Sequence, residues 1–596
     1  MAHIAGENWE VFSMNVAGSR VYYWPPAFRT GLAVTLFLSG VFGTAGAFAD
    51  DDGIGFRPGN SFESGNLLIS RSVYDNNPTN VVAGATLLPP NCIAPNCVTA
   101  TDSGAYPFVF NNVLTDGSFG ITSKIVLDQL KPSGKFVSSL EVKVPHSGDD
   151  RDDPTKERVV TSFPSKSEIA LNLSTDGRVV TFMGYLAPVN ALDVSNSNTP
   201  GVVDPTNPVP GSYYRVVAEV DAFGSFHFTK TNAYSGNNGR AAVLNNKNGA
   251  NIVYTVGNAG NGGNPQPNGI IIGAGAQILT AERTPLAAQT PGLPTPVGSF
   301  NITQLGLKAD KTGKDTNFRG LTVSNNVIYV TKGSGSNGVN TVYFIDATGF
   351  DGNGKPLACP SGVGLPGATA TLPAAPIPYD ATKLQTLGVV PYNMCILKGF
   401  PTTLAKTATS FPFGVWFADA KTLYVTDEGD GTNTYDPSTG KYTTAAAQTG
   451  AGLQKWVFDS TLGAWKRAYV LQSGLNLGVP YAVGGYPTGL NPKTSLPWAP
   501  AADGLRNITG RVNRDGTATI WAITSTVSGN GDQGADPNQL VMITDNLAAT
   551  SVPAGESFAA IRTARFGEVL RGVSFTPGTD RDRIVDADDH RGDDHH

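Results

Sequence analysis

Short runs of alternating apolar and polar residues, separated by Gly and Asn, occur along most of the chain. The most regular run combines aliphatic and aromatic residues and ends at Gly, as in residues 252–257 (Ile-Val-Tyr-Thr-Val-Gly) and 327–333. Alternation with a period of two residues, bounded by turn residues, is typical of β-strands. The run recurs at residues 179–184 and 423–429 and, in a looser form, at 520–523. The pattern predicts an all-β protein with an internal repeat.

Each copy of this run is the second part of a four-part repeat. A short apolar strand precedes it, at residues 169–171, 242–244, 321–323, 415–417 and 508–509. A third strand follows and often ends in Asp, as in residues 216–221 and 456–459, and a more polar fourth strand comes next, as in 225–229. Four strands per repeat are typical of a β-propeller blade. We therefore identify five complete blades.

The two ends of the chain supply the parts of a sixth blade. Residues 570–575 repeat a first strand with no second strand after it, whereas residues 66–70, 124–128 and 135–140 resemble second, third and fourth strands without a first. A C-terminal strand that joins the N-terminal strands would close the ring and remove both open sheet edges. We predict a six-bladed β-propeller whose ring is closed by a C-terminal inner strand. A tandem pair of β-sandwiches is the alternative, but it does not explain the complementary ends.

The termini differ in composition from the repeats. The apolar residues 31–45 precede residues 47–49 (Ala-Phe-Ala), which have the small-x-small spacing of a signal-peptidase site, and three Asp follow at once. A membrane anchor is the alternative, but the run is shorter than the ~20 residues that a spanning helix needs. We predict a signal peptide at residues 1–49, a propeller at 50–579 and a disordered Asp- and His-rich tail at 580–596.

The formal net charge of −6 is concentrated in two acidic segments, residues 580–596 and 149–153. The rest of the chain is nearly neutral, so no global field favours nucleic acid or an anionic membrane as a partner. Export would permit disulfide bonds. Local pairing of Cys92 with Cys97 and of Cys359 with Cys395 is the simplest of the three connectivities. We expect a secreted or periplasmic monomer with no membrane span after signal removal.

Arg-Gly precedes an aliphatic strand in two segments, Phe318-Arg319-Gly320-Leu321 and Leu570-Arg571-Gly572-Val573. With Ile125-Val126-Leu127-Asp128, followed shortly by Pro132-Ser133-Gly134, they resemble a class of uncharacterised exported bacterial β-propeller proteins. The resemblance spans residues 60–580. It implies the fold and gives no catalytic residues.

Charged residues stand at the beginning of the predicted innermost strands. These strands start at one mouth of the central channel, where the sequence places Glu168, Arg240, Arg319, Phe413, Arg506 and Arg571. A guanidinium group is permanently charged and binds carboxylate or phosphate through paired donors. We therefore predict a site for a small anionic molecule or acidic sugar, formed by Arg240, Arg319, Arg506, Arg571 and Glu168. The alternative is that each Arg pairs with an Asp or a carbonyl group of a neighbouring blade.

Carboxylates within Gly- and Asn-rich loops follow the second strands. Asp427, Asp430 and Asp532 could supply the oxygen ligands that Ca²⁺ prefers, although their spacing does not match an EF-hand. This set supports a second hypothesis, a Ca²⁺-assisted hydrolase or lactonase with Glu168 as the base. A third hypothesis is a surface or matrix interaction protein without catalysis. The sequence contains no GxSxG, HExxH or P-loop motif, so it assigns no catalytic residue and no certain cofactor.

Overall fold

The computed structural model divides the chain into two units, Met1–Arg57 and Pro58–His596. The structure describes residues 61–92, 95, 97–107, 120–144, 157–203, 207–258, 275–282, 287–288, 296–308, 317–335, 337–347, 349, 357–377 and 393–580. All of them belong to the second unit. The predicted signal peptide and all but the first residue of the predicted tail lie outside the described residues.

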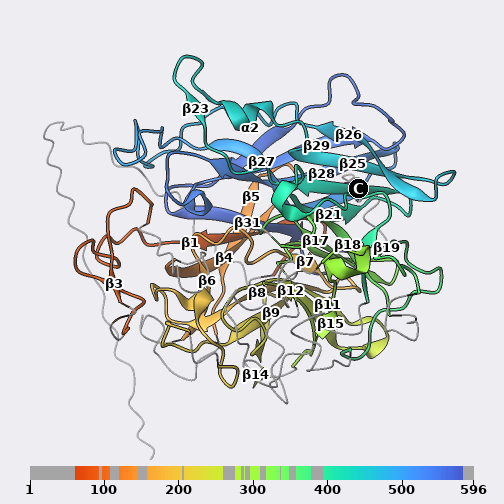
Figure 1. Cartoon of the computed structure of the whole chain (residues 1–596), viewed down its shortest axis with the longest axis horizontal. Coiled ribbons are helices and arrows are strands. Elements are labelled where there is room, and N and C mark those ends of the chain that lie inside the picture. The colour runs from red at the N-terminus through yellow and green to blue at the C-terminus, as the bar shows by residue number, and fades with distance from the viewer. Residues whose placement is uncertain are drawn as a thin grey trace, which may run out of the picture. The chain divides into compact units, whose positions relative to one another are not determined.

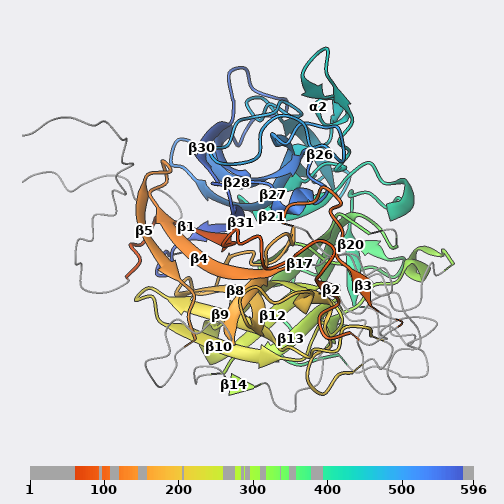
Figure 2. The same cartoon turned by 90° about the vertical axis from the view of Figure 1, so that its left-hand side faces the viewer.

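The described fold is all-β, and its sheets have a propeller-like arrangement (Figures 1 and 2). Four sheets are separate. The first contains β11 (Gly239–Asn245), β12 (Ile252–Gly257), β13 (Ala276–Thr280) and β15 (Pro296–Gly298). The second contains β16 (Leu321–Ser324), β17 (Val327–Lys332), β18 (Thr341–Ile345), β20 (Met394–Leu397) and β19 (Val363–Gly364). The third contains β21 (Pro412–Phe417), β22 (Thr422–Asp427), β25 (Gly452–Asp459) and β26 (Ala464–Leu471). The fourth contains β27 (Ala501–Val512), β28 (Thr517–Val527), β29 (Gln539–Asn546) and β30 (Ala559–Thr563).

A ten-stranded sheet combines both ends of the described chain. One half contains β31 (Glu568–Phe575), β1 (Leu67–Val73), β4 (Thr122–Leu130) and β5 (Phe136–Glu141). The other half contains β7 (Asn172–Leu173), β8 (Val179–Ala187), β9 (Arg215–Asp221), β10 (Phe226–Thr231) and β14 (Ala287–Ala288). Strand β6 (Arg158–Ser162) pairs with one end of β4 and one end of β8, and it therefore joins the two halves.

The remaining elements are short. Two hairpins pair β2 (Leu87–Leu88) with β3 (Val98–Thr99) and β23 (Tyr435–Asp436) with β24 (Lys441–Tyr442). Helix α2 spans Thr443–Ala447, and the 3-10 turns are Val194–Asn196, Lys247–Gly249, Ile302–Leu305, Ala405–Thr407 and Gln533–Ala535. No helix among the described residues is long and apolar enough to span a membrane.

The predicted pairing of the two chain ends is confirmed. Strand β31 runs antiparallel to β1, from Phe575 opposite Leu67 to Glu568 opposite Val73, and the two strands lie side by side in Figures 1 and 2. The predicted second, third and fourth strands also form. The prediction of one first strand is wrong, because residues 169–171 do not form a strand and β7 begins only at Asn172. Ile169 has a φ of 49°, which is outside the extended region and interrupts a ladder.

The aromatic residue of each second strand packs into the core. Phe182, Tyr254, Tyr329, Tyr424 and Trp521 are all 7% exposed or less. Where these residues have a polar atom, it can reach a segment distant in sequence: the Tyr254 hydroxyl donates to the Pro373 carbonyl at 2.6 Å and the Trp521 indole to the Pro132 carbonyl at 2.9 Å. A large apolar ring with one satisfied polar atom stabilises a buried contact. Burial of the ring is the property that all five positions share.

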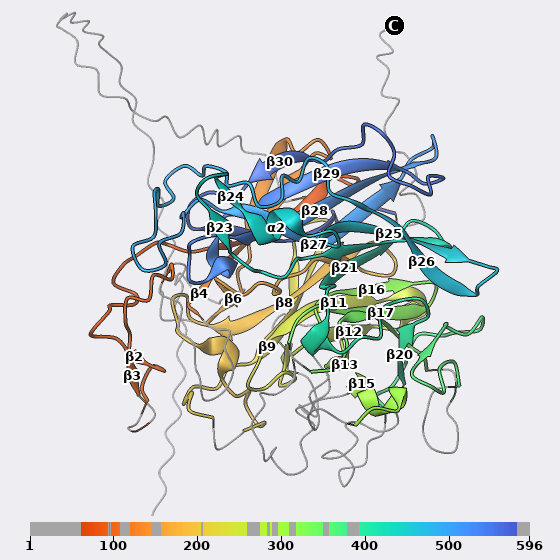
Figure 3. The same ribbon diagram turned by 45° about the horizontal axis from the view of Figure 1, so that its top comes forward.

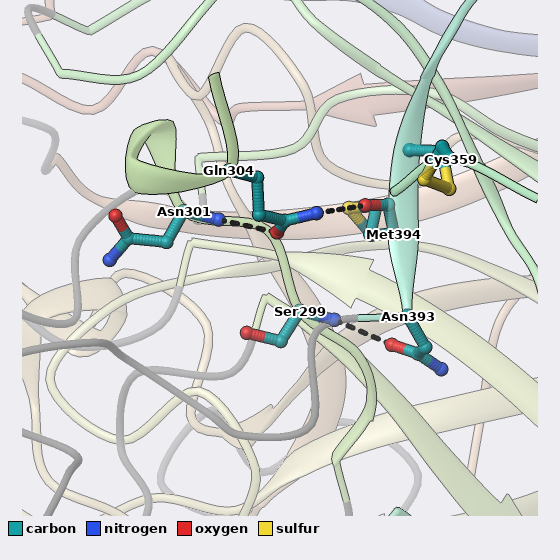
Figure 4. The surroundings of a disulfide bond; sticks show 7 residues. Ser299, Asn301, Gln304, Cys359, Asn393 and Met394 are labelled. Carbon is teal, nitrogen blue, oxygen red and sulfur yellow. Dashed lines mark hydrogen bonds between the residues drawn. A yellow bond between two sulfur atoms is a disulfide. The ribbon is translucent and has the colours of Figure 1, made fainter. Parts of the chain in front are cut away.

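Both predicted disulfide bonds are present, Cys92–Cys97 and Cys359–Cys395. The second attaches to β20 itself through Cys395. Figure 4 shows its surroundings, where the Gln304 side chain donates to the Met394 carbonyl at 3.2 Å and the Ser299 amide donates to the Asn393 side chain at 3.0 Å. Cys359 and Cys395 are fully buried. Two disulfide bonds fit a protein that matures in an oxidising compartment.

Candidate functional site

Residues 163–168 form most of the connection between β6 and β7, and two Arg side chains donate hydrogen bonds to this stretch. We call it the head segment. Arg571 donates through Nη2 to the Phe163 carbonyl, and Arg319 donates through Nη1 to the Ser167 hydroxyl. The Asn238 side chain donates to the Ser165 hydroxyl at 3.3 Å. Arg571 on β31, Arg319 just before β16 and Asn238 just before β11 therefore hold one short segment from several sides.

Glu168 anchors the end of this segment. Its Oε2 accepts from the Thr161 hydroxyl at 2.7 Å and from the Ser162 amide at 2.9 Å. Its Oε1 accepts from the Tyr185 hydroxyl at 2.5 Å and from the Asn238 side chain at 3.4 Å. Both oxygens are thus occupied in a side chain that is 1% exposed. This geometry is that of a structural carboxylate rather than a free general base.

The four predicted Arg residues are all buried, between 4% and 9% exposed. Arg240 donates to the Phe318 carbonyl at 2.8 Å and to the Asn317 side chain, and Arg319 donates to Ser334 as well as to Ser167. Arg506 forms an ion pair with Glu428, with 3.0 Å between Nε and Oε2. No hydrogen bond joins the two Nη groups of Arg506 to any residue that the structure describes.

Lys166, in the middle of the head segment, has no hydrogen bond or ion pair to a described residue. Burial lowers the pKa of its ammonium group, and the positive charges of Arg506 and Arg319 lower it further, against the opposing effect of Glu428 and Asp532. Burial alone would raise the pKa of Glu428, but Arg319, Arg506 and Lys166 lower it overall. Lys166 therefore shares one electrostatic environment with two of the predicted Arg residues.

Arg571 belongs to the same environment. Its Nη2 donates to two carbonyl groups, those of Phe163 and, at 2.9 Å, Gly534. Its Nε and Nη1 are buried and have no hydrogen-bond partner among the described residues. Burial lowers the pKa of Arg571 to about 9, and the charge of Arg506 contributes to the shift. Buried donors without partners are uncommon and call for a ligand, ion or water to satisfy them.

We call this set of residues the charged cluster. Its five cations are Lys166, Arg240, Arg319, Arg506 and Arg571, and its three carboxylates are Glu168, Glu428 and Asp532. The four Arg and Glu168 were predicted from the sequence, whereas Lys166 and Glu428 were not. Both lie in loops without periodicity, and only their proximity in sequence to Glu168 and Asp427 could have indicated them.

The three Asp residues considered as Ca²⁺ ligands have separate surroundings. Asp427 accepts from the Phe411 and Gly429 amides at 2.8 and 3.1 Å, and burial raises its pKa to about 6. Asp430 is exposed and accepts from the Thr432 amide at 2.8 Å. Asp532 caps a 3-10 turn through the Gly534 amide at 2.9 Å and belongs to the charged cluster. Within the described ranges, no group of three or more His, Cys, Asp or Glu has a geometry that could hold a metal ion.

No protein-family model and no curated protein matches the chain. Among solved structures, an α-L-arabinofuranosidase from Podospora anserina in complex with cellotriose aligns at a TM-score of 0.26 and 9% identity, covering 68% of this chain and 94% of that one. An ulvan lyase aligns at a TM-score of 0.26 and 9% identity, covering 78% and 94%. A Synechocystis apocarotenoid oxygenase aligns at 0.18 and 10% identity, covering 77% and 60%. Similarity at this level supports no inference about function.

Proposed function

We propose that the protein is an exported six-bladed β-propeller that binds a small anionic ligand, a carboxylate or an acidic sugar, at the charged cluster. The blade count treats the ten-stranded sheet as two blades, β31-β1-β4-β5 and β7-β8-β9-β10, joined at one end by β6. With the four separate sheets this makes six. In Figure 3 the sheet that contains β21 lies next to the sheet that contains β27, as neighbouring blades would.

The observation that supports anion binding is a set of cationic donors without partners. The ammonium group of Lys166 and the Nη groups of Arg506 have no hydrogen-bond acceptor among the described residues. They share their electrostatic environment with Arg571, whose Nε and Nη1 are also unpaired. A carboxylate accepts several charge-assisted hydrogen bonds at once and would satisfy these donors. A divalent cation at Asp532 would instead be repelled by Lys166, Arg506 and Arg571.

This arrangement also bears on the hypothesis of a surface protein without a site. That hypothesis expects each Arg to be neutralised by a carboxylate of a neighbouring blade. Arg506 has such a partner in Glu428, but Arg571 has no ion pair among the residues that the structure describes. Glu168 and Asp532 raise the pKa of Arg571 against the effect of burial, but neither forms an ion pair with it, and its Nε and Nη1 have no acceptor among the described residues. An anionic ligand would supply the acceptors that these buried donors lack.

The test is thermal unfolding of the mature chain with glucuronate, galacturonate, citrate and phosphate, and with glucose as the uncharged control. A ligand that binds only the folded state stabilises it by about 2.7 kcal/mol at 100 times its Kd. We expect at least one anion to raise Tm, and K166Q to abolish the shift. K466Q, which removes an exposed Lys on β26, is the matched control and should keep it. The proposal is wrong if no anion raises Tm or if K166Q responds like the parent chain.

A further inference from the structure

A cavity of about 590 Å³ lies between the innermost strands, beyond the charged cluster. Its wall begins at Gly320, Gly414 and Asn507, which directly follow Arg319, Phe413 and Arg506, and it extends to the β16–β17 turn. Neighbouring innermost strands are in close contact at this level. A Cβ atom on Gly320 would lie 2.1 Å from the Phe413 carbonyl oxygen, and one on Gly414 would lie 2.7 Å from Ile508.

Equivalent positions of four innermost strands line this cavity. Each lies three residues after the residue that its strand was predicted to place at the channel mouth. The four are Thr322, Trp416, Thr509 and Ser574. Asn172 of β7 adds a carboxamide. The side chains of Asn172, Thr322, Thr509 and Ser574 make no hydrogen bond to any described residue. Polar groups inside a folded protein are nearly always satisfied, so these groups must bond to water or to a ligand.

Trp416 gives the wall a rigid aromatic surface. A Cβ atom on Gly510 would lie 2.7 Å from the indole ring, so the ring rests against bare backbone. The ring also stacks on Tyr424, with 5.8 Å between centroids and 28° between planes. Trp416 is nevertheless partly exposed, and its Nε1 has no acceptor among the described residues. It therefore offers apolar surface and one free N–H donor at a fixed position.

The charge of the wall differs from that of the charged cluster. Among the described residues that line the cavity, Lys247 is the only charged one, and its side chain is exposed. A volume of about 590 Å³ lies within the ~300–1,000 Å³ range of small-molecule sites. Hydroxyl and amide groups, one indole and aliphatic side chains match a ligand that has many hydroxyl groups and apolar C–H faces but no charge.

We propose that this cavity binds a neutral mono- or disaccharide, with Trp416 against a sugar face and with Asn172, Thr322 and Thr509 as hydrogen-bond partners. This site is separate from the charged cluster and does not depend on it. Each neutral hydrogen bond to the ligand contributes about 0.5–1.5 kcal/mol. Loss of one hydroxyl should therefore weaken binding by about 2- to 12-fold.

The experiment titrates the mature chain with glucose, galactose, rhamnose, cellobiose and maltose while intrinsic Trp fluorescence is recorded. We expect one of these sugars to give a saturable change, W416F to abolish the change, and T509V to raise Kd by up to about 12-fold. K166Q should bind the same sugar as the parent chain does, because its substitution lies in the other site.

Calorimetric titration of T322V, which removes a hydroxyl while keeping the side-chain shape, provides a second test if W416F does not fold. The proposal is overturned if none of the five sugars binds. It is also overturned if T322V and T509V both retain the parent Kd. Binding that is lost in K166Q but kept in T509V would assign the sugar to the charged cluster and would equally overturn the proposal.

Discussion

The hydroxyl group of Thr426, on the second strand of one sheet, donates a hydrogen bond to the carbonyl group of Arg506, on the first strand of the next sheet. The same hydroxyl accepts from the Gly414 amide at 2.7 Å. Thr331 makes the equivalent pair of contacts with the Phe413 carbonyl and, at 2.8 Å, the Gly320 amide. One hydroxyl thus links three strands, and it fixes the backbone of a cluster residue relative to the neighbouring sheet.

We predict that T426V destabilises the protein. The substitution keeps the shape of the side chain but leaves the Arg506 carbonyl and the Gly414 amide without their partner in a buried contact between sheets. An unsatisfied buried polar group costs about 1–3 kcal/mol. The midpoint of urea unfolding should fall accordingly with an unchanged m-value.

The control is T422V, on the same strand. Thr422 is 6% exposed, yet its hydroxyl makes no hydrogen bond to a described residue. The free energy of unfolding of T422V should differ from that of the parent chain by less than about 0.5 kcal/mol. Equal losses in the two variants would show that the effect comes from β22 as a whole and not from the link to Arg506.

Asp128 forms ion pairs with two Arg residues at the junction of the two chain ends. It is fully buried and pairs with Arg71 at 2.7 Å and with Arg562 of β30. D128N leaves Arg562 without its carboxylate, whereas Arg71 keeps an ion pair with Glu568. Removing one partner of a buried ion pair costs about 3–5 kcal/mol. D128N should therefore lower the free energy of unfolding by about 3 kcal/mol, the lower end of this range, measured by urea denaturation.

E141Q is the appropriate comparison for D128N. Glu141 lies on the neighbouring strand β5, and its nearest cations, Lys124, Lys143 and Arg158, all lie 3.7 Å away. Partly exposed pairs of this kind contribute about 0–1 kcal/mol. If E141Q were as destabilising as D128N, the closure between β31 and β1 would not depend on the buried carboxylate.

The strands of the fold were predictable because their alternating residues meet one dominant requirement, burial between sheets. The Tyr of 327–333 and the Tyr of 423–429 show this directly, since Tyr329 and Tyr424 are both buried on β17 and β22. The head segment was not predictable in the same way. Its course depends on carbonyl and hydroxyl contacts with Arg319 and Arg571, which lie more than a hundred residues away in sequence. Such contacts produce no periodic pattern in the sequence, so Lys166 was not predicted.

The two disulfide bonds should differ in their contribution to stability. Cys359–Cys395 joins residues 36 apart, whereas Cys92–Cys97 joins residues 5 apart. A crosslink restricts the unfolded chain more when it closes a longer loop. The double variant C359A/C395A should therefore have a lower Tm than C92A/C97A, measured by calorimetry under oxidising conditions. The reverse order would indicate that the hairpin of β2 and β3 is more important for stability than its short loop suggests.

Stability should decrease as the pH rises from about 5 to 7.5, and Asp536 should cause part of this decrease. Its Oδ1 accepts from Tyr486 at 2.8 Å and from Ser528 at 3.0 Å, while its Oδ2 is buried without a partner among the described residues. Burial raises the pKa of Asp536 to about 7, against about 3.9 in an unfolded chain.

Between these two pKa values the folded state of the parent chain binds more protons than the unfolded state does. Its stability is therefore complete below the unfolded pKa and is lost as the pH rises through the folded one, by at most about 1.4 kcal/mol per pH unit for one group. D536N retains an Oδ1 acceptor but cannot ionise. Urea unfolding at pH 5, 6 and 7.5 should show D536N gaining stability relative to the parent chain as the pH increases. Parallel pH profiles would mean that Asp536 is ionised throughout this range and that its burial is compensated by another group.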